Sequence, residues 1–302
     1  MRLAGVLAVA VLFAPLAIPP GVHTDFDFYW RAAALWRDGL DPYAMRPGDP
    51  AWPLVDPIFY PLPTLILVWP LTFLPIRVAA LVFAAGAVAG MAWLATRDDR
   101  WRLVLLLSSP AFLHAISYGQ WSPYLVVGAL VPSVAFLLAA KPTLGLACFC
   151  YRPTWRGVAS MAAIGVLSLA LMPDWPLRWL ENLSAVRHHP TPIAMPFGWL
   201  VLLALIRWRQ PEARLLVAMA CVPQLLAYAD QLPLVLVART KLEGACLAVT
   251  GWLTLLMAVS QPAWNFVPAT AGYYVLLGCY APALYLVLRR PNEAPRPAQA
   301  VP

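Results

Sequence analysis

Long apolar runs separated by short polar clusters limit the fold of this 302-residue chain more than any other feature. Hydrophobic residues make up 62% of it and charged residues 12%, about half of the charged share in a soluble domain. A helix needs about 20 apolar residues to cross a bilayer, so the sequence predicts an all-α, polytopic membrane protein with about nine to eleven transmembrane or re-entrant helices. We expect one integral membrane domain over residues 1–290 and a disordered cytoplasmic tail over residues 291–302.

The basic residues lie mostly in clusters between the apolar runs, and the formal net charge is +7. Cytoplasmic loops of membrane proteins are enriched in arginine and lysine, and nearly every cluster falls on one side if the runs alternate across the membrane. We therefore interpret the charge as a signal of topology and of contact with membrane lipids, and we expect no nucleic-acid partner. This places the N-terminus in the cytoplasm and the protein in the plasma or inner cell membrane.

The first two expected spans are separated by a long extracytoplasmic segment over residues 20–76, which carries two amphipathic or re-entrant pieces, at 25–38 and 62–74. The run 121–140 fits either one helix or a tight hairpin that turns at Pro132-Ser133. Residues 173–195 read as a polar loop. The expected helices cover residues 3–19, 77–96, 103–117, 157–172, 196–206, 215–229, 245–260 and 271–288.

The stretch His23-Thr-Asp-Phe-Asp-Phe-Tyr-Trp30 is the first polar interruption, and it holds two acids beside the membrane. If a helix begins here, Thr24 is a good N-cap and Thr24-x-x-Asp27 fits a capping box. Asp27 has a second structural role available, because Arg31 follows it by one helical turn. Asp25 has no partner nearby in the sequence, and the helix dipole favours its ionised form. We take both acids as candidate catalytic residues, with Asp25 as the stronger candidate for a general base.

Further candidates come from later polar interruptions and from the aromatic residues of the first loop. Cationic or hydrogen-bond-donating side chains could stabilise negative charge on a substrate, and the candidates are Lys141, Arg187, His188 and His189. Candidates that contact a substrate, a lipid or a cavity are Tyr29, Trp36, Tyr43, Trp52, Tyr60, Gln120 and Tyr124. Snorkelling, headgroup contact and an aromatic belt explain the same residues without a substrate. The five cysteines show no zinc-type spacing, and we expect no metal and no cofactor.

Several short motifs occur in a characteristic order. They are Asp25-Phe-Asp-Phe-Tyr-Trp, Gly39-Leu-Asp-Pro-Tyr43, Phe59-Tyr60-Pro61-Leu-Pro, Pro70-Leu-Thr-Phe-Leu-Pro75, Gly119-Gln120 and Lys141-Pro142-Thr143. In this order they resemble the polyprenyl-phosphate-dependent mannosyltransferase-like family of integral membrane glycosyltransferases, glycosyltransferase family 87, with the GT-C architecture. The resemblance is best over residues 23–75 and fair to about residue 143. It implies a polyprenyl-phosphate sugar donor, an extracytoplasmic acceptor, and an acid in the first outside loop acting as base; Asp25 matches that position.

The chemistry needs one positioned carboxylate, because an inverting displacement at the anomeric carbon requires a base but no second carboxylate. Together with the donor and acceptor that the resemblance implies, this leads us to expect transfer of mannose, or another hexose or pentose, from polyprenyl phosphate to a glycolipid or polysaccharide acceptor. Two alternatives stay open. One is a carrier for a lipid-linked or small polar solute. The other is a catalytically inactive membrane homologue, suggested by the short chain and by Leu62 where the family pattern has proline.

Overall fold

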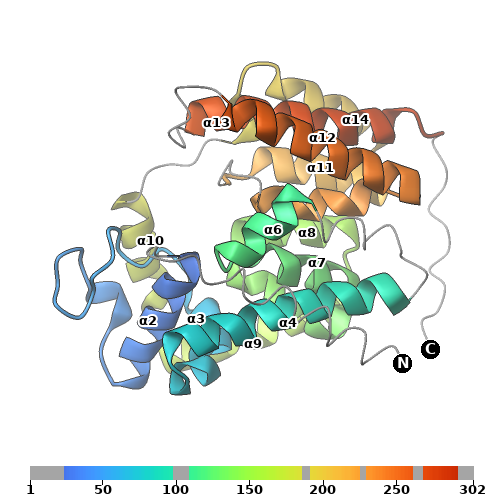
Figure 1. Cartoon of the computed structure of the whole chain (residues 1–302). Helices are drawn as coiled ribbons and strands as arrows, with labels where there is room; N and C mark the ends of the chain where they lie inside the picture. Colours follow the sequence, from blue (N-terminus) through green and yellow to red (C-terminus); the bar gives the residue numbers. More distant parts are fainter. Residues whose placement is uncertain (1–23, 98–108, 186–190, 225–228, 261–267, 292–302) are drawn as a thin grey trace.

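The computed structural model describes residues 24–97, 109–185, 191–224, 229–260 and 268–291, and every regular element within these ranges is helical (Figure 1). The all-α prediction is confirmed for this part of the chain. The expected first span, the cytoplasmic N-terminus and the tail beyond Pro291 lie outside the described residues, as does the beginning of the span expected over 103–117.

Two of the described helices are long and apolar enough to cross a membrane, as expected of a membrane protein. They are α4 (Ile76–Arg97) and α12 (Lys241–Val259). A third span results if α9 (Trp155–Leu171) and α10 (Trp175–Ala185), which are bent by 96° relative to each other, are taken together. The predicted span over 77–96 matches α4 closely. The larger total of about nine to eleven transmembrane or re-entrant helices stays a prediction.

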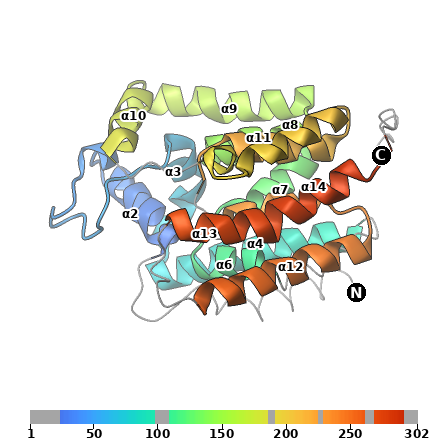
Figure 2. The ribbon, with the colours of Figure 1, turned by 90° about the horizontal axis from the view of Figure 1, so that it is seen from above.

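The other helices are shorter. They are α2 (Asp25–Arg37), η2 (Pro42–Ala44), α3 (Leu62–Val68), η3 (Trp69–Phe73), α6 (Pro110–Ser117), α7 (Ser122–Leu130), η4 (Pro132–Ala140), α8 (Pro142–Tyr151), η5 (Pro192–Ala194), η6 (Gly198–Arg207), α11 (Pro211–Cys221), η7 (Ala229–Val237), α13 (Pro268–Val275), η8 (Leu276–Tyr280) and α14 (Ala281–Leu288). Figure 2 shows α9 along one edge of the bundle and α12 along the opposite edge, with α2 and α10 together at one end. The longest helices run roughly alongside one another in both views (Figures 1 and 2).

The two pieces predicted in the first loop are present almost as expected. α2 covers the first, and α3 with η3 covers the second. Trp30 Nε1 donates to the Leu71 carbonyl at 3.1 Å, which fastens α2 to η3. Thr64 Oγ1 donates to the Ala140 carbonyl at 2.5 Å, which fastens α3 to the end of η4. These bonds hold the first loop against the residues around position 141.

The ambiguous run 121–140 is a helical hairpin. α7 ends at Leu130, the next residue Val131 has an extended backbone (φ −123°, ψ 96°), and η4 begins at Pro132. A residue before proline avoids helical angles, which explains the turn. The two arms pack closely, because a Cβ at Gly128 would lie 3.1 Å from the Leu138 side chain. The hairpin interpretation is therefore confirmed.

Two expected boundaries were wrong. The helix predicted over 215–229 ends at Cys221, because Val222 precedes Pro223 and takes extended angles (φ −102°, ψ 145°). The loop predicted over 173–195 contains α10, which has a proline in its first turn and an amphipathic sequence. The polar residues of that segment suggested a loop, but Arg178, Glu181 and Asn182 belong to this helix.

Candidate functional site

Five polar side chains from distant parts of the sequence meet beside the N-terminus of α2. Four of them, Asp25, Tyr60, Gln120 and Lys141, were predicted as candidates from the sequence. The fifth, Asp230, was not. They come from α2, the first loop, the turn between α6 and α7, the N-cap of α8 and the start of η7. The fold thus assembles one polar cluster from elements that are far apart in the chain.

Asp25 is the acceptor at the centre of this cluster. The Tyr60 hydroxyl donates to Asp25 Oδ2 at 3.3 Å, and the Gln120 side-chain amide donates to the same oxygen. Within the described residues, no hydrogen bond reaches Asp25 Oδ1. Tyr60 and Gln120 are buried, whereas Asp25 is partly exposed. The carboxylate is therefore oriented through one oxygen while the other has no donor from the described chain.

Gly119 makes the approach of Gln120 to Asp25 possible. Its φ is +65°, a backbone conformation that residues with a side chain rarely adopt. A Cβ at this position would lie 2.6 Å from the Phe26 Cβ. The chain therefore passes directly against α2 at this point. The adjacent Gln120 is brought to the first turn of α2 as a result.

Lys141 and Asp230 complete the cluster on its other side. Lys141 Nζ lies 2.6 Å from Asp230 Oδ1 and donates to Gln120 Oε1 at 3.5 Å. Asp230 is fully buried, and the Lys141 side chain retains 19% of its exposed area. The Gln120 amide thus links an ion pair to Asp25, with its oxygen facing Lys141 and its nitrogen facing the carboxylate.

Burial raises the pKa of Asp25 from 3.8 to about 6. The positive charge of Lys141 opposes this rise, and the negative charge of Asp230 adds to it. The Tyr60 hydrogen bond lowers the pKa, and the nearby Asp27 raises it. The sequence suggested that the helix N-terminus alone would keep Asp25 ionised; burial outweighs that effect. A carboxyl group with a pKa near 6 is mostly ionised at neutral pH and still basic enough to accept a proton.

Asp27 has the structural role that its position suggested. Its Oδ2 accepts from the Thr24 backbone nitrogen at 2.6 Å and from the Thr24 hydroxyl at 3.0 Å, in a capping box. The expected pairing with Arg31 does not form among the described residues, and Arg31 Nε is buried without a hydrogen-bond partner there. Asp27 therefore caps α2, two residues away from the acid at the centre of the cluster.

The aromatic candidates lie at different depths. Tyr29 is buried against Tyr60, with ring centroids 5.0 Å apart. Tyr43 and Trp52 are buried and donate to the backbone carbonyls of Tyr60 and Asp56. These three residues therefore belong to the buried core, and their rings do not present a free face.

Two further aromatic candidates, Trp36 and Tyr124, are less deeply buried. Trp36 is half-buried on the same helix as Asp25. The hydroxyl group of Tyr124 donates to the Phe83 carbonyl at 2.6 Å. The candidates Arg187, His188 and His189 lie outside the described residues.

Asp230 was missed because the sequence placed it at the end of a helix, in a loop open to water. A signal was present in the charges. Lys141 lies at the end of an apolar run and has no acid near it in the sequence, and Asp230 has no base near it. Two isolated opposite charges in an apolar chain favour a buried pair, because each alone would be costly to bury.

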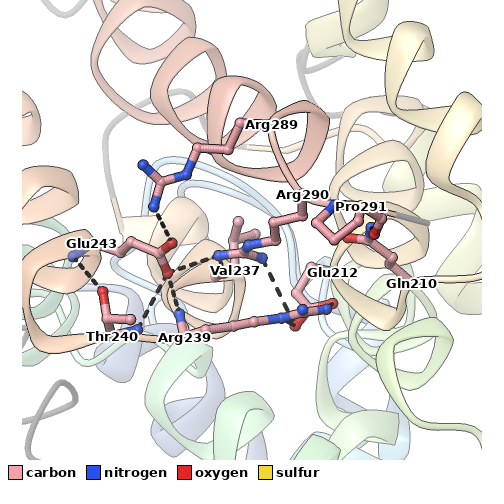
Figure 3. A network of polar contacts seen from close by, with 9 residues as sticks. All are labelled: Gln210, Glu212, Val237, Arg239, Thr240, Glu243, Arg289, Arg290 and Pro291. Atoms are coloured by element: carbon pink, nitrogen blue, oxygen red, sulfur yellow. Dashed lines mark hydrogen bonds and ion pairs between the residues drawn. The ribbon is translucent and has the colours of Figure 1, made fainter. Parts of the chain in front are cut away.

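A second polar cluster lies beyond the other end of η7 (Figure 3). Glu243 accepts from Arg289 at 2.6 Å, from Arg290 at 2.8 Å and from the Arg239 backbone nitrogen at 2.6 Å. Arg239 also makes two bonds to Glu212, at 2.7 and 3.0 Å. Arginines that the sequence placed in separate basic loops therefore converge and tie the ends of α11, α12 and α14 together.

In the part of the chain that the structure describes, no group of three or more histidine, cysteine or acidic side chains is arranged to hold a metal ion. The chemical groups of the Asp25 cluster are two carboxylates, an amide, a phenol and an ammonium group. No family model matches the chain, and neither the curated proteins nor the solved structures give a match.

Proposed function

We propose that the protein is an inverting membrane glycosyltransferase of GT-C-like architecture, which moves a sugar from polyprenyl phosphate to a glycolipid or glycan acceptor. The observation that carries the proposal is the Asp25 carboxylate, oriented through Oδ2 by Tyr60 and Gln120 and partly exposed beside an ammonium group. The resemblance of the motifs around Asp25, Tyr60, Gln120 and Lys141 supports the same conclusion. All four lie in one cluster.

The reaction is a single displacement. Asp25 accepts the proton of the acceptor hydroxyl as its oxygen attacks the anomeric carbon. The bond between that carbon and the phosphate oxygen breaks, and the electron pair leaves with polyprenyl phosphate. Inversion follows because the nucleophile enters opposite the leaving group. Lys141, with one ammonium hydrogen beyond those directed to Asp230 and Gln120, supplies positive charge for the departing phosphate.

A lipid-linked donor suits the location of the cluster. Asp25 begins a short helix whose neighbours α3 and η3 are apolar, and α4 follows directly as a candidate span. A lipid-anchored phosphate presents its sugar at the membrane surface, close to where such a helix would lie. Because the proposed donor is a polyprenyl-phosphate sugar, we propose a hexosyltransferase activity and test mannose first.

The proposal is tested with the purified full chain in lipid nanodiscs. The donor is polyprenyl phosphate carrying radiolabelled mannose, and the acceptor is a lipid extract of the source membranes. We expect label to move into the acceptor with inverted anomeric configuration, and Asp25→Asn to abolish the transfer while the protein remains folded. Full transfer by Asp25→Asn would contradict the assignment of the base, and absence of transfer by the wild-type chain would contradict the proposed function.

A carrier function is the second candidate, and the buried Lys141–Asp230 pair is the observation that favours it. Ionisable pairs inside membrane proteins often lie on the pathways of ions and solutes. Uptake of a lipid-linked or small polar solute into proteoliposomes, without any sugar transfer, would establish this function in place of the first.

A further inference from the structure

Helix α10 is attached to the first loop by its polar face. Arg178 forms an ion pair with Asp41, and Trp179 Nε1 donates to the Phe59 carbonyl at 2.8 Å. Asn182 Nδ2 is buried and donates to the carbonyls of Tyr43 and Ile58, at 3.1 Å each. Three side chains on one face of α10 thus hold the loop over residues 41–60.

The opposite face of α10 is apolar and exposed. Leu177, Leu180 and Leu183 are spaced by three residues, so they lie along one side of the helix. They are 67%, 52% and 39% exposed, respectively. Glu181 is exposed and lies at the polar edge of this leucine face.

The end of α9, which comes just before α10 in the chain, is also apolar and exposed. Val166, Leu169 and Leu171 at the end of α9 are 67%, 46% and 50% exposed. The chain then turns by 96° into α10, at the end of the bundle where α2 also lies (Figure 2). If α9 runs through the membrane beside the other long helices, α10 must run along the membrane surface.

We propose that α10 lies in the plane of the membrane interface, with its leucine face inserted among the lipid acyl chains, and that it holds the loop 41–60 in place from that position. A lipid surface is the partner because the exposed leucines of α10 follow exposed apolar residues at the end of α9 and face away from the loop that α10 holds. Leucines on one face and charged or amide groups on the opposite face are the pattern of interfacial helices, which sink about 5–10 Å into the headgroup boundary.

This arrangement links the membrane surface to Asp25. Asn182 holds the Tyr43 carbonyl, the Tyr43 hydroxyl donates to the Tyr60 carbonyl at 3.0 Å, and the Tyr60 hydroxyl donates to Asp25. A shift of α10 out of the interface would therefore be transmitted to the orientation of the carboxylate. The inference goes beyond the proposed function, since lipid contact at α10 does not depend on what the site transforms.

The lipid contact is tested by spin labelling of the full chain in nanodiscs of phosphatidylcholine and phosphatidylglycerol. Single labels are placed with Leu180→Cys and, as a matched control one residue away, Glu181→Cys, after the exposed Cys221 and Cys246 are replaced by serine. We expect the label at position 180 to collide mainly with oxygen, which concentrates in lipid, and the label at 181 to collide several-fold more with a water-soluble nickel chelate. Equal nickel access at both positions would overturn the proposal. Spin–spin broadening of the label at position 180, with neither oxygen nor the nickel chelate gaining access to it, would also overturn the proposal. That result would identify a second copy of the chain as the partner.

The attachment of the loop is tested by hydrogen exchange of the same nanodisc preparation. Asn182→Ala removes two buried hydrogen bonds, and we expect exchange over residues 41–60 to accelerate by about 10-fold or more. Exchange in α12 should not change. Ser184→Ala is the control, because its hydroxyl bonds only within α10, to the Glu181 carbonyl. Unchanged exchange over 41–60 in Asn182→Ala would show that α10 does not hold the loop.

Discussion

Two polar clusters lie near the two ends of η7, and they use their acidic groups differently. At one end, both oxygens of Glu243 are engaged by arginine side chains or backbone nitrogens, and both oxygens of Glu212 face Arg239. At the other end, Asp25 receives two donors on one oxygen and, within the described residues, none on the second. An acid whose two oxygens both accept hydrogen bonds therefore holds helices together. An acid that is oriented through one oxygen keeps the other available for chemistry.

The two clusters also differ in their supply of positive charge. The arginine cluster has more basic than acidic side chains, so every carboxylate in it has a cation in contact. In the Asp25 cluster, the single ammonium group of Lys141 contacts Asp230 and reaches Asp25 only through Gln120. The pKa of Asp25 is therefore raised to about 6, because burial is not offset by a direct ion pair.

The largest expected effect separates two neighbouring acids of α2. Asp25→Asn removes the proposed base, and we expect sugar transfer to fall by about 10²–10⁴-fold with little change in folding. Asp27→Asn weakens a helix cap, and we expect it to lose about 1 kcal/mol of stability while transfer continues. Transfer rates and thermal unfolding of both variants in nanodiscs provide the measurement. Equal loss of transfer in the two variants would show that the cluster depends on the helix cap and not on Asp25 as a base.

The next largest effect concerns the arginine cluster around Glu212 and Glu243. Glu243→Gln leaves Arg289 and the buried Arg290 without a full counter-charge, and breaking a buried ion pair of this kind costs about 3–5 kcal/mol. We expect a clear fall in thermal stability with unchanged transfer per folded molecule. A loss of turnover in the folded variant would mean that the arginine cluster also takes part in function.

Lys141 and Asp230 should act on Asp25 in opposite directions. Lys141→Met removes the positive charge that lowers the pKa of Asp25, so that pKa should rise. Asp230→Asn removes a negative charge and releases Lys141 towards Gln120, so the pKa should fall. The protonated-carboxyl infrared band that disappears in Asp25→Asn reports this titration without any substrate. Shifts of the same sign in both variants would contradict the described cluster.

Tyr60→Phe should give the smallest effect. It removes one donor at 3.3 Å from Asp25 Oδ2 and keeps the ring against Tyr29. A net hydrogen bond is worth about 1 kcal/mol, so we expect transfer to fall about fivefold, with a small rise in the pKa of Asp25. Tyr43→Phe is the matched control, since its hydroxyl bonds to the Tyr60 carbonyl and not to the carboxylate. An equal loss in both variants would assign the effect to the position of the loop.

Most of the site could be predicted because its residues interrupt apolar sequence. Asp25 and Lys141 each stand out as charges without a local partner, and the order of motifs connected them with Tyr60 and Gln120. Asp230 escaped prediction because sequence position does not show whether a charge at a helix end faces water or protein. Its burial results from the packing of η7 against distant helices, which no local pattern records.

In the fold too, features set by local sequence were predicted and features set by distant packing were not. α2, α3 and α4 follow from capping, proline and hydrophobic patterns within their own sequences, and their bounds were predicted closely. The end of α11 follows from Pro223 and was available in the sequence, although the apolar run beyond it favoured a longer helix. α10 was not predicted, because a short amphipathic helix becomes stable only when its polar face meets the loop that it holds.

The most direct test of the central claim is the pH dependence of sugar transfer by the wild-type chain in nanodiscs, measured beside the infrared titration of Asp25. A base acts only when it is deprotonated, so transfer should rise with pH through a midpoint near 6 and level off above it. The infrared midpoint should coincide with the kinetic one, and Lys141→Met should move both upward together. A rate that is independent of pH while Asp25 titrates near 6 would show that this carboxylate is not the base.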